Sequence, residues 1–181
     1  MGAAASTDPD LILLIISSPS GAGKTTLTRR LLQEFPELRF SVSHTTRQPR
    51  ANEVDGQDYH FVGKNDFQEI IADNGFAEWA EVHGNLYGTC VKEIELARDS
   101  GKIGVLFDVD YQGARQIKEK FPDAIGVFIL PPSMEELRRR LDGRGSDDAA
   151  SRQRRFDKAR EEIGHYPFFD YMIVNDEVQQ L

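Results

Sequence analysis

Short apolar runs alternate with longer amphipathic segments along most of this chain. The segments that read as buried strands are Leu11–Ile16, Gly104–Phe107, Ala124–Leu130 and Tyr171–Val174, with shorter strand patterns at Arg39–Ser43 and Phe76–Val82. The segments that read as helices are residues 24–35, 65–74, 91–100, 112–120 and 134–141. Because strands alternate with helices, the pattern predicts an α/β fold with a parallel sheet and helices on both faces.

The first predicted strand leads into the glycine-rich segment Ser18–Thr25. Its sequence, SPSGAGKT, matches the phosphate-binding pattern G-x-x-x-x-G-K-[ST] at every fixed position except the first, where serine replaces glycine. Gly21 and Gly23 permit a tight turn that points N–H groups at phosphate oxygens. Lys24 supplies a positive charge for phosphates, and the Thr25 hydroxyl can ligate Mg²⁺. A glycine-rich connection without a ligand is disfavoured, because strand, loop, lysine and helix follow in the required order.

Composition narrows the class of protein. The length of 181 residues predicts one compact domain, and the net charge of −8 argues against nucleic acid as a partner without excluding nucleotides. The single cysteine, Cys90, cannot form an intrachain disulfide, which favours a reducing compartment, and we expect the cytoplasm. The longest apolar run is too short to span a membrane, and residues 1–9 read as a disordered tail. The sequence leaves the oligomeric state open.

Two carboxylates follow the predicted strand Gly104–Phe107. An acidic residue at this place, here Asp108, commonly faces the metal ion of a phosphate-binding loop. The alternative is that Asp108 caps the next turn. Asp110 lies two residues on, projects to the same side, and is expected to reach a second substrate.

The polar stretch from His44 to Asp58 is too long and too charged for a simple connection. It contains Arg47 and Arg50, and arginine suits bidentate contacts to phosphate. Solvated surface charge is the alternative for these two residues. The hydroxyls of Tyr59 and Tyr87, which can also donate to phosphate, favour an anion site.

Basic residues concentrate between residues 138 and 160, where nine bases and four acids give a local charge of +5. Arg144 stands between Gly143 and Gly145. Two helices joined by such a turn predict a movable lid, and a solvated helical hairpin is the alternative.

Together these motifs resemble guanylate kinases, which transfer a phosphoryl group from ATP to GMP. The resemblance spans about residues 11–176 and rests on Ser20–Lys24, Ser41–Arg50, Gly88–Thr89, Asp108–Gly113, Ile129–Ser133, Gly143–Gly145 and Ile173–Asp176. It implies a P-loop NTPase-type parallel sheet flanked by helices, with a small mixed α/β GMP-binding region and a helical lid. The implied domain is 10–181, divided into a core (10–42, 90–133 and 165–181), the GMP-binding region (43–89) and the lid (134–164).

The resemblance also implies roles for individual residues. The residues expected to bind GMP are Ser43, Arg47, Arg50, Tyr59, Glu78, Tyr87, Gly88, Thr89, Asp108 and Asp110. Those expected to bind ATP are Ser20, Gly21, Ala22, Gly23, Lys24, Thr25, Thr26, Arg144 and Asn175. Those expected to act in catalysis are Lys24, Arg47, Arg140, Arg144 and Arg155. The implied cofactor is Mg²⁺, held by Thr25 and by Asp108, the latter directly or through water.

The chemistry of guanine agrees with these roles. Guanine offers adjacent donors at N1 and the 2-amino group, which a carboxylate such as Glu78 can accept, and an acceptor at O6 for a hydroxyl such as Ser43. Adenine lacks the N1 donor, so buried groups left unpaired would disfavour AMP by about 10⁴- to 10⁵-fold. The acceptor phosphate needs no strong base, because its second pKa is about 6.

Two other functions fit parts of the pattern. A kinase for another phosphate ester, such as a ribose bisphosphate, is disfavoured by Ser43, Glu78 and Asp110 together. A non-catalytic guanylate-kinase-like module that binds phosphoproteins is disfavoured by the intact loop and by Arg144.

Guanylate kinases normally continue with a helix beyond the position of Leu181, and we expect the loss of such a helix to affect stability more than chemistry.

Overall fold

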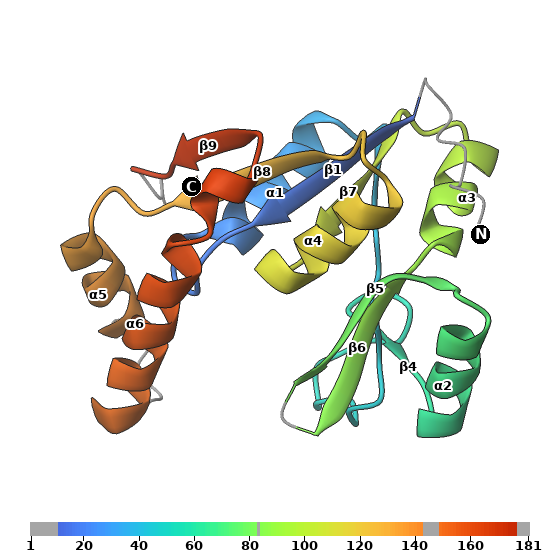
Figure 1. Ribbon diagram of the computed structural model, residues 1–181, viewed down its shortest axis with the longest axis horizontal. Coiled ribbons are helices and arrows are strands. Elements are labelled where there is room, and N and C mark those ends of the chain that lie inside the picture. The colour runs from blue at the N-terminus through green and yellow to red at the C-terminus, as the bar shows by residue number, and fades with distance from the viewer. Residues whose placement is uncertain (1–10, 83, 143–148, 177–181) are drawn as a thin grey trace.

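The computed structural model describes residues 11–82, 84–142 and 149–176, so the expected N-terminal tail lies outside the described residues. Two sheets of unequal size make up the fold, with helices against both (Figure 1). The larger sheet is parallel and has helices on its two faces, as the sequence predicts. No helix within the described ranges is both long enough and apolar enough to cross a bilayer.

The larger sheet has five parallel strands. In order across the sheet they are β2 (Leu38–Phe40), β7 (Gly104–Asp108), β1 (Ile12–Ser17), β8 (Ile125–Leu130) and β9 (Tyr171–Val174). β1 is central, and its register sets Ile12 beside Gly104 on one side and Leu14 beside Ile125 on the other. The loop after β1 therefore leaves the carboxyl edge in the middle of the sheet, the edge at which ligands bind in open parallel sheets.

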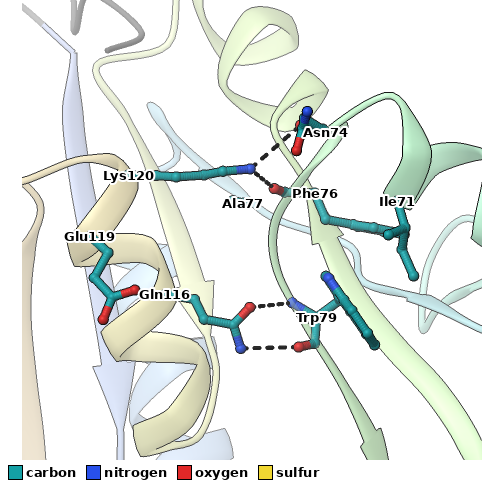
Figure 2. A pocket seen from close by; sticks show the side chains of 8 residues that line it. All are labelled: Ile71, Asn74, Phe76, Ala77, Trp79, Gln116, Glu119 and Lys120. Atoms are coloured by element: carbon teal, nitrogen blue, oxygen red, sulfur yellow. Dashed lines mark hydrogen bonds between the residues drawn. The ribbon is translucent and has the colours of Figure 1, made fainter. Parts of the chain in front are cut away.

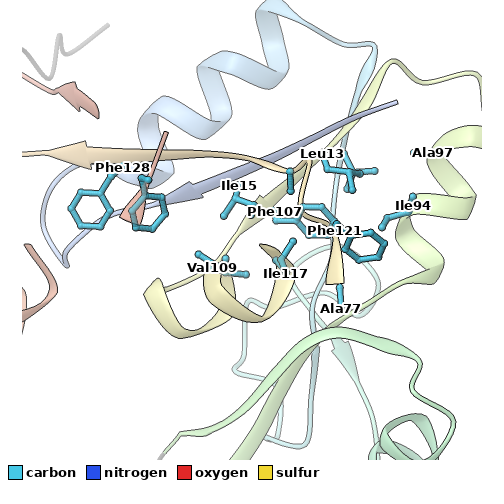
Figure 3. Packing of buried hydrophobic residues seen from close by; sticks show 14 residues of the cluster. Leu13, Ile15, Ala77, Ile94, Ala97, Phe107, Val109, Ile117, Phe121 and Phe128 are labelled. Atoms are coloured by element: carbon cyan, nitrogen blue, oxygen red, sulfur yellow. The ribbon is translucent and has the colours of Figure 1, made fainter. Parts of the chain in front are cut away.

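Alternate residues of β1 contribute side chains to two apolar clusters, one on each face of the larger sheet. Ile15 packs in one cluster with Phe107 and Ile117 (Figure 3), and Ile16 packs in the other with Leu106. The helices that contribute to these clusters are α1 (Lys24–Glu34), α3 (Lys92–Asp99) and α4 (Tyr111–Lys120). Burial on both faces holds β1 in the middle of the sheet, so the loop after it is supported from both sides.

The smaller sheet lies beside the larger one and carries the long polar stretch. Its strands, in order, are β4 (His60–Phe61), β3 (His44–Thr45), β6 (Asn85–Cys90) and β5 (Phe76–Val82), and its helix is α2 (Lys64–Ala72). Phe67 of α2 stacks on Phe76 at 4.3 Å between ring centroids. Because side chains alternate along strands, Tyr87 and Thr89 of β6 point to the face opposite Cys90. One face of this sheet is thus apolar and the other polar.

Two further helices form a hairpin, α5 (Met134–Asp142) and α6 (Ala149–Ile163), followed by the short 3₁₀ helix η1 (Tyr166–Phe168). Leu137 and Leu141 of α5 pack against Ala159 of α6. The turn between the two helices, which includes Arg144, falls outside the described residues.

Sequence patterns placed most of the long elements correctly and the short ones poorly. Two expectations for longer strands are wrong: β6 was not predicted as a strand, and β9, expected to be buried, is exposed along its length because it is the outermost strand of the larger sheet. The strand predicted at Arg39–Ser43 is wrong at its end, since β2 stops at Phe40 and the Ser41 hydroxyl donates to the Leu106 carbonyl at 2.9 Å. The sequence did not predict β3 and β4. A strand of two residues has no detectable alternation, so only its partners in the sheet define it.

Candidate active site

The loop between β1 and α1 turns through two left-handed glycines. Gly21 has φ of +92° and Gly23 of +94°, values that side-chain-bearing residues rarely adopt. Gly23 directly precedes α1, whose first N–H groups have no partner within the helix. The loop therefore presents the positive end of a helix at the carboxyl edge of the larger sheet.

Lys24 connects this loop to the end of β7. Its ammonium group forms an ion pair with Asp108, and its Nζ lies 3.5 Å from the Val109 carbonyl oxygen. The next turn is capped by Asp110, whose Oδ1 accepts the Gly113 N–H at 2.9 Å. The alternative in which Asp108 caps that turn is therefore wrong. Asp108 instead lies beside the phosphate-binding loop.

The loop is supported from behind by Asn175 and by α5. The buried Asn175 side chain donates to the Ala22 carbonyl at 2.8 Å, and Arg140 donates to the Asn175 carbonyl at 3.0 Å. A Cβ added at Gly21 would lie 3.0 Å from a methyl carbon of Leu141. These contacts fix the loop backbone against α5 and the strand end of β9.

Two side chains of α6 also reach the loop. Arg155 donates to the Ser20 hydroxyl at 3.2 Å, and the Ser20 N–H donates to Glu162 at 3.3 Å. Burial raises the pKa of Glu162, and the Asp110 carboxylate adds to that effect, while the Ser20 N–H and Lys24 oppose it. The sequence did not point to Glu162, because an acid is not expected at a phosphate loop.

On the polar face of the smaller sheet, three side chains form a chain of hydrogen bonds. Thr89 donates to Glu78 at 2.7 Å, and its Oγ1 lies 3.0 Å from Ser43 Oγ. A hydroxyl carries one hydrogen, so Ser43 is the donor to Thr89 in this arrangement. Glu78 is only 8% exposed, and this burial raises its pKa to about 7, with a further contribution from the Asp110 carboxylate that the Thr89 bond partly offsets.

Beside this chain, Arg47 is held in a fixed orientation. Its NH1 and NH2 donate to the two carboxylate oxygens of Glu53 at 2.9 and 2.8 Å. These hydrogen bonds lower the pKa of Glu53 to about 2. The guanidinium lies 5.4 Å from the ring centroid of Tyr59, whose ring is 6.0 Å from that of Tyr87. Three residues expected to hold a phosphate thus lie together, and Glu53, which the sequence did not indicate, orients one of them.

Two aspartates link the phosphate loop to the smaller sheet electrostatically. Asp110 raises the pKa of Glu78 on one side and of Glu162 on the other. Asp108, which pairs with Lys24, contributes to the raised pKa of Tyr59. The phosphate loop and the smaller sheet, far apart in sequence, therefore interact electrostatically through these two aspartates.

Some expected site residues make no such contact. The Arg50 side chain is exposed, and its main-chain N–H donates to Glu53 at 2.8 Å. Thr25 and Thr26 are exposed at the start of α1. Gly88 is required by packing, since an added Cβ would lie 2.9 Å from Phe76.

The residues expected to hold Mg²⁺ fit that ion only together with a nucleotide. Within the described part of the chain, no cluster of three or more His, Cys, Asp or Glu side chains could hold a metal. Thr25 and Asp108 offer a hydroxyl and a carboxylate, which are hard oxygen donors. Mg²⁺ is commonly bound in this way, by one or two protein oxygens plus phosphates and water.

Comparisons with known proteins agree on one family. The family model described as guanylate kinase matches residues 11–181. A guanylate kinase of Geobacter metallireducens is 54% identical over 166 residues, which cover 92% of this chain and 81% of the relative. One of Shewanella violacea is 53% identical, covering 91% and 80%. The crystal structure of guanylate kinase from Anaplasma phagocytophilum, 36% identical, superposes with a TM-score of 0.71 over 94% of this chain and 79% of that one.

Proposed function

This chain belongs to the guanylate kinase family and is an ATP:GMP phosphotransferase, and we propose that the residues described above form its active site. The observation that supports this most is the chain of hydrogen bonds from the half-buried Ser43 through the buried Thr89 to the buried Glu78. It provides a carboxylate and hydroxyls for the edge of a guanine base, next to a phosphate-binding loop.

We assign the GMP phosphate to Arg47, Arg50, Tyr59 and Tyr87. Glu53 accepts one hydrogen bond from each terminal nitrogen of Arg47, and the Gln48 carbonyl accepts a second hydrogen bond from NH1 at 2.8 Å. Glu53 engages the edge formed by NH1 and NH2, and the Tyr87 hydroxyl is a further hydrogen-bond partner of Arg47. We assign the Nε side of the guanidinium, together with the Tyr87 hydroxyl, to the phosphate oxygens. Glu53 thus aims the arginine while leaving its phosphate-binding edge available.

We assign Glu78, Ser43, Thr89 and Asp110 to guanine, with Gly88 and Asp108 beside them. When GMP binds, Glu78 accepts from N1–H and from the 2-amino group, and the Ser43 hydroxyl turns from Thr89 to O6. The carboxylate must be ionised for this, and a nearby pair of guanine donors lowers the cost of ionising it.

We assign the ATP phosphates to the loop residues Ser20 to Thr26, with Arg140, Arg144 and Arg155 contributed by the helical hairpin. The contacts of Arg140 with Ala22 and of Arg155 with Ser20 support this assignment. Asn175 serves the same site by holding the Ala22 carbonyl. In the absence of ATP the Ser20 N–H donates to Glu162. When ATP binds, a phosphate oxygen would replace Glu162 as the acceptor of this hydrogen bond.

The reaction needs positioning and charge stabilisation more than proton transfer. The GMP phosphate is largely dianionic at neutral pH and attacks as it is, since its second pKa is about 6. Lys24 and the arginines bring two polyanions together in line and stabilise charge that develops on the transferred group. Thr25 and Asp108, the latter directly or through water, would hold Mg²⁺, which would supply positive charge to the ATP phosphates.

In this proposal the larger sheet and its helices form the core, residues 43–89 the GMP-binding region and residues 134–164 a lid. Closure of the lid over ATP would exclude water and suppress hydrolysis.

Calorimetric titration separates the enzyme from a non-catalytic module that binds phosphoproteins. We expect GMP and Mg²⁺-ATP each to bind at one site, and ATP binding to weaken when EDTA removes the metal. Binding of GMP without any binding of ATP would favour the non-catalytic module.

A further inference from the structure

One face of α4 lies against β5, the strand that carries Glu78. Gly113, Gln116 and Lys120 are spaced i, i+3 and i+7 and therefore share that face. Each of the three meets β5 or the turn before it. None of them takes part in the catalytic roles assigned above.

Gln116 binds the main chain of β5 in the way a neighbouring strand would. The Trp79 N–H donates to Gln116 Oε1 at 3.1 Å, and Gln116 Nε2 donates to the Trp79 carbonyl at 3.0 Å (Figure 2). β5 is the outermost strand of the smaller sheet, with β6 on its other side. Edge strands carry unpaired N–H and carbonyl groups, so this side chain satisfies two of them at the residue next to Glu78.

Lys120 binds the same strand one turn further along α4. Its Nζ donates to the Phe76 carbonyl at 2.5 Å and to the Asn74 carbonyl at 3.4 Å (Figure 2). Glu78 lies between the two bound residues, Phe76 and Trp79. The backbone on both sides of its carboxylate is therefore attached to α4.

Gly113 completes the contact at the carboxylate itself. A Cβ at this position would lie 3.1 Å from Glu78 Oε2 and 3.0 Å from Val109. Because residue 113 is glycine, α4 can approach the Glu78 carboxyl group closely without a side chain between them. The helix begins at Tyr111 and is capped by Asp110, which lies two residues after Asp108, the last residue of β7 beside the phosphate loop.

We propose that Gln116 and Lys120 are positioning residues that fix β5 relative to the phosphate loop, so that the Glu78 carboxylate meets both guanine donors. This proposal rests on the assignment of Glu78 to guanine. Two hydrogen-bond acceptors on one base edge must be placed to a fraction of an ångström, and small displacements of a reacting group can cost about 100-fold in rate. Loss of the attachment would therefore harm guanine recognition before it harms the fold.

The test compares Gln116→Met, which keeps the length of the side chain without its hydrogen bonds, with the control Glu119→Ala. Glu119 lies on the same helix and lines the same cavity of about 320 Å³, but its partner is Arg115, at 3.9 Å. For each protein, steady-state kinetics give kcat and the KM values for GMP, for ATP and for inosine monophosphate, which lacks the 2-amino group.

We expect Gln116→Met to raise the KM for GMP about tenfold and to reduce the preference for GMP over inosine monophosphate, with the KM for ATP little changed. Lys120→Met, at an exposed position, should act in the same direction and provides a second variant if the first unfolds. Glu119→Ala should match the wild type.

A folded Gln116→Met whose KM for GMP and base preference are both unchanged would overturn the proposal. If Gln116→Met lowered only kcat and kept the same base preference, the proposal would also be overturned, and Gln116 would have only a structural role. If the wild type itself did not prefer GMP, the assignment of Glu78 would fail instead, which the same measurements reveal.

Discussion

Single residues acquire their roles from their surroundings, and Glu78 is the clearest case. Its carboxyl is nearly buried and receives one hydrogen bond from Thr89, and the negative charge of Asp110 adds to the burial in raising its pKa. The sequence could single out Glu78, Lys24 and the arginines because their residue types suit nucleotides. It could not single out Glu53 or Glu162, since acids at phosphate sites become interpretable only when their partners are seen.

We predict that the KM for GMP falls as pH rises through about 7, the pKa of Glu78 in the free protein. Below that value the carboxyl is protonated and cannot accept from both guanine donors. Kinetics between about pH 6 and pH 8 measure this, and the GMP phosphate titrates in the same range and must be allowed for. Glu78→Gln should raise the KM throughout and remove the part of the pH dependence that belongs to the enzyme. A Gln variant with the wild-type profile would contradict the assignment.

Glu78 should also affect how stability depends on pH. Its folded pKa of about 7 lies above the ordinary value of 4.5, so the folded state binds more protons between these values. The contribution of Glu78 to the free energy of unfolding is therefore full below pH 4.5 and is lost as pH rises to about 7. Urea unfolding of the wild type and of Glu78→Gln across this range should give a difference between the two curves that follows this loss, since other groups such as His44 titrate in both proteins. Parallel curves for the two proteins would show that Glu78 ionises normally.

Lys24→Ala should lower turnover by several orders of magnitude while the fold survives. The ammonium group is partly exposed and pairs with Asp108, so its removal costs little packing but leaves the transferred phosphates without a fixed charge. Single-turnover kinetics and thermal melting together measure the two effects. Turnover close to that of the wild type would refute the role given to Lys24.

At the scale of elements, most long strands and helices follow from their apolar period, whereas β6 and the short strands do not. β1, β7 and β8 are buried, so their sequences are almost entirely apolar. β3 and β4 have two residues each and exist through their pairing with one another and with β6. The GMP-binding side was therefore predicted from its polar residues while its sheet was not.

The helical hairpin is tied to the phosphate loop by packing, which predicts an effect of Leu141→Ala. Leu141 is 2% exposed, packs against α6 and lies next to Gly21. Its truncation should lower the free energy of unfolding by about 2–5 kcal/mol and raise the KM for ATP more than that for GMP. The control Leu96→Ala, at a residue 36% exposed on α3, should change both quantities little. Equal effects of Leu141→Ala on the two substrates would contradict a role of this contact in holding the ATP loop.

For the whole molecule, the site depends on elements that are distant in sequence and meet at the carboxyl edge of the larger sheet. The order of motifs predicted that a phosphate loop, a carboxylate pair and an arginine-rich hairpin belong to one site. How the smaller sheet attaches to the larger one was not predictable, because Gln116 and Lys120 look like ordinary surface residues of a helix. Their function is visible only in the main-chain groups they bind.

The most direct measurement is the release of ADP from Mg²⁺-ATP with GMP, AMP, CMP, UMP and ribose phosphates offered in turn as acceptors. The site described here predicts ADP formation with GMP, and kcat/KM lower by about 10⁴-fold or more with AMP. Comparable turnover of AMP or of a ribose phosphate would contradict recognition of guanine by Glu78, Ser43 and Thr89.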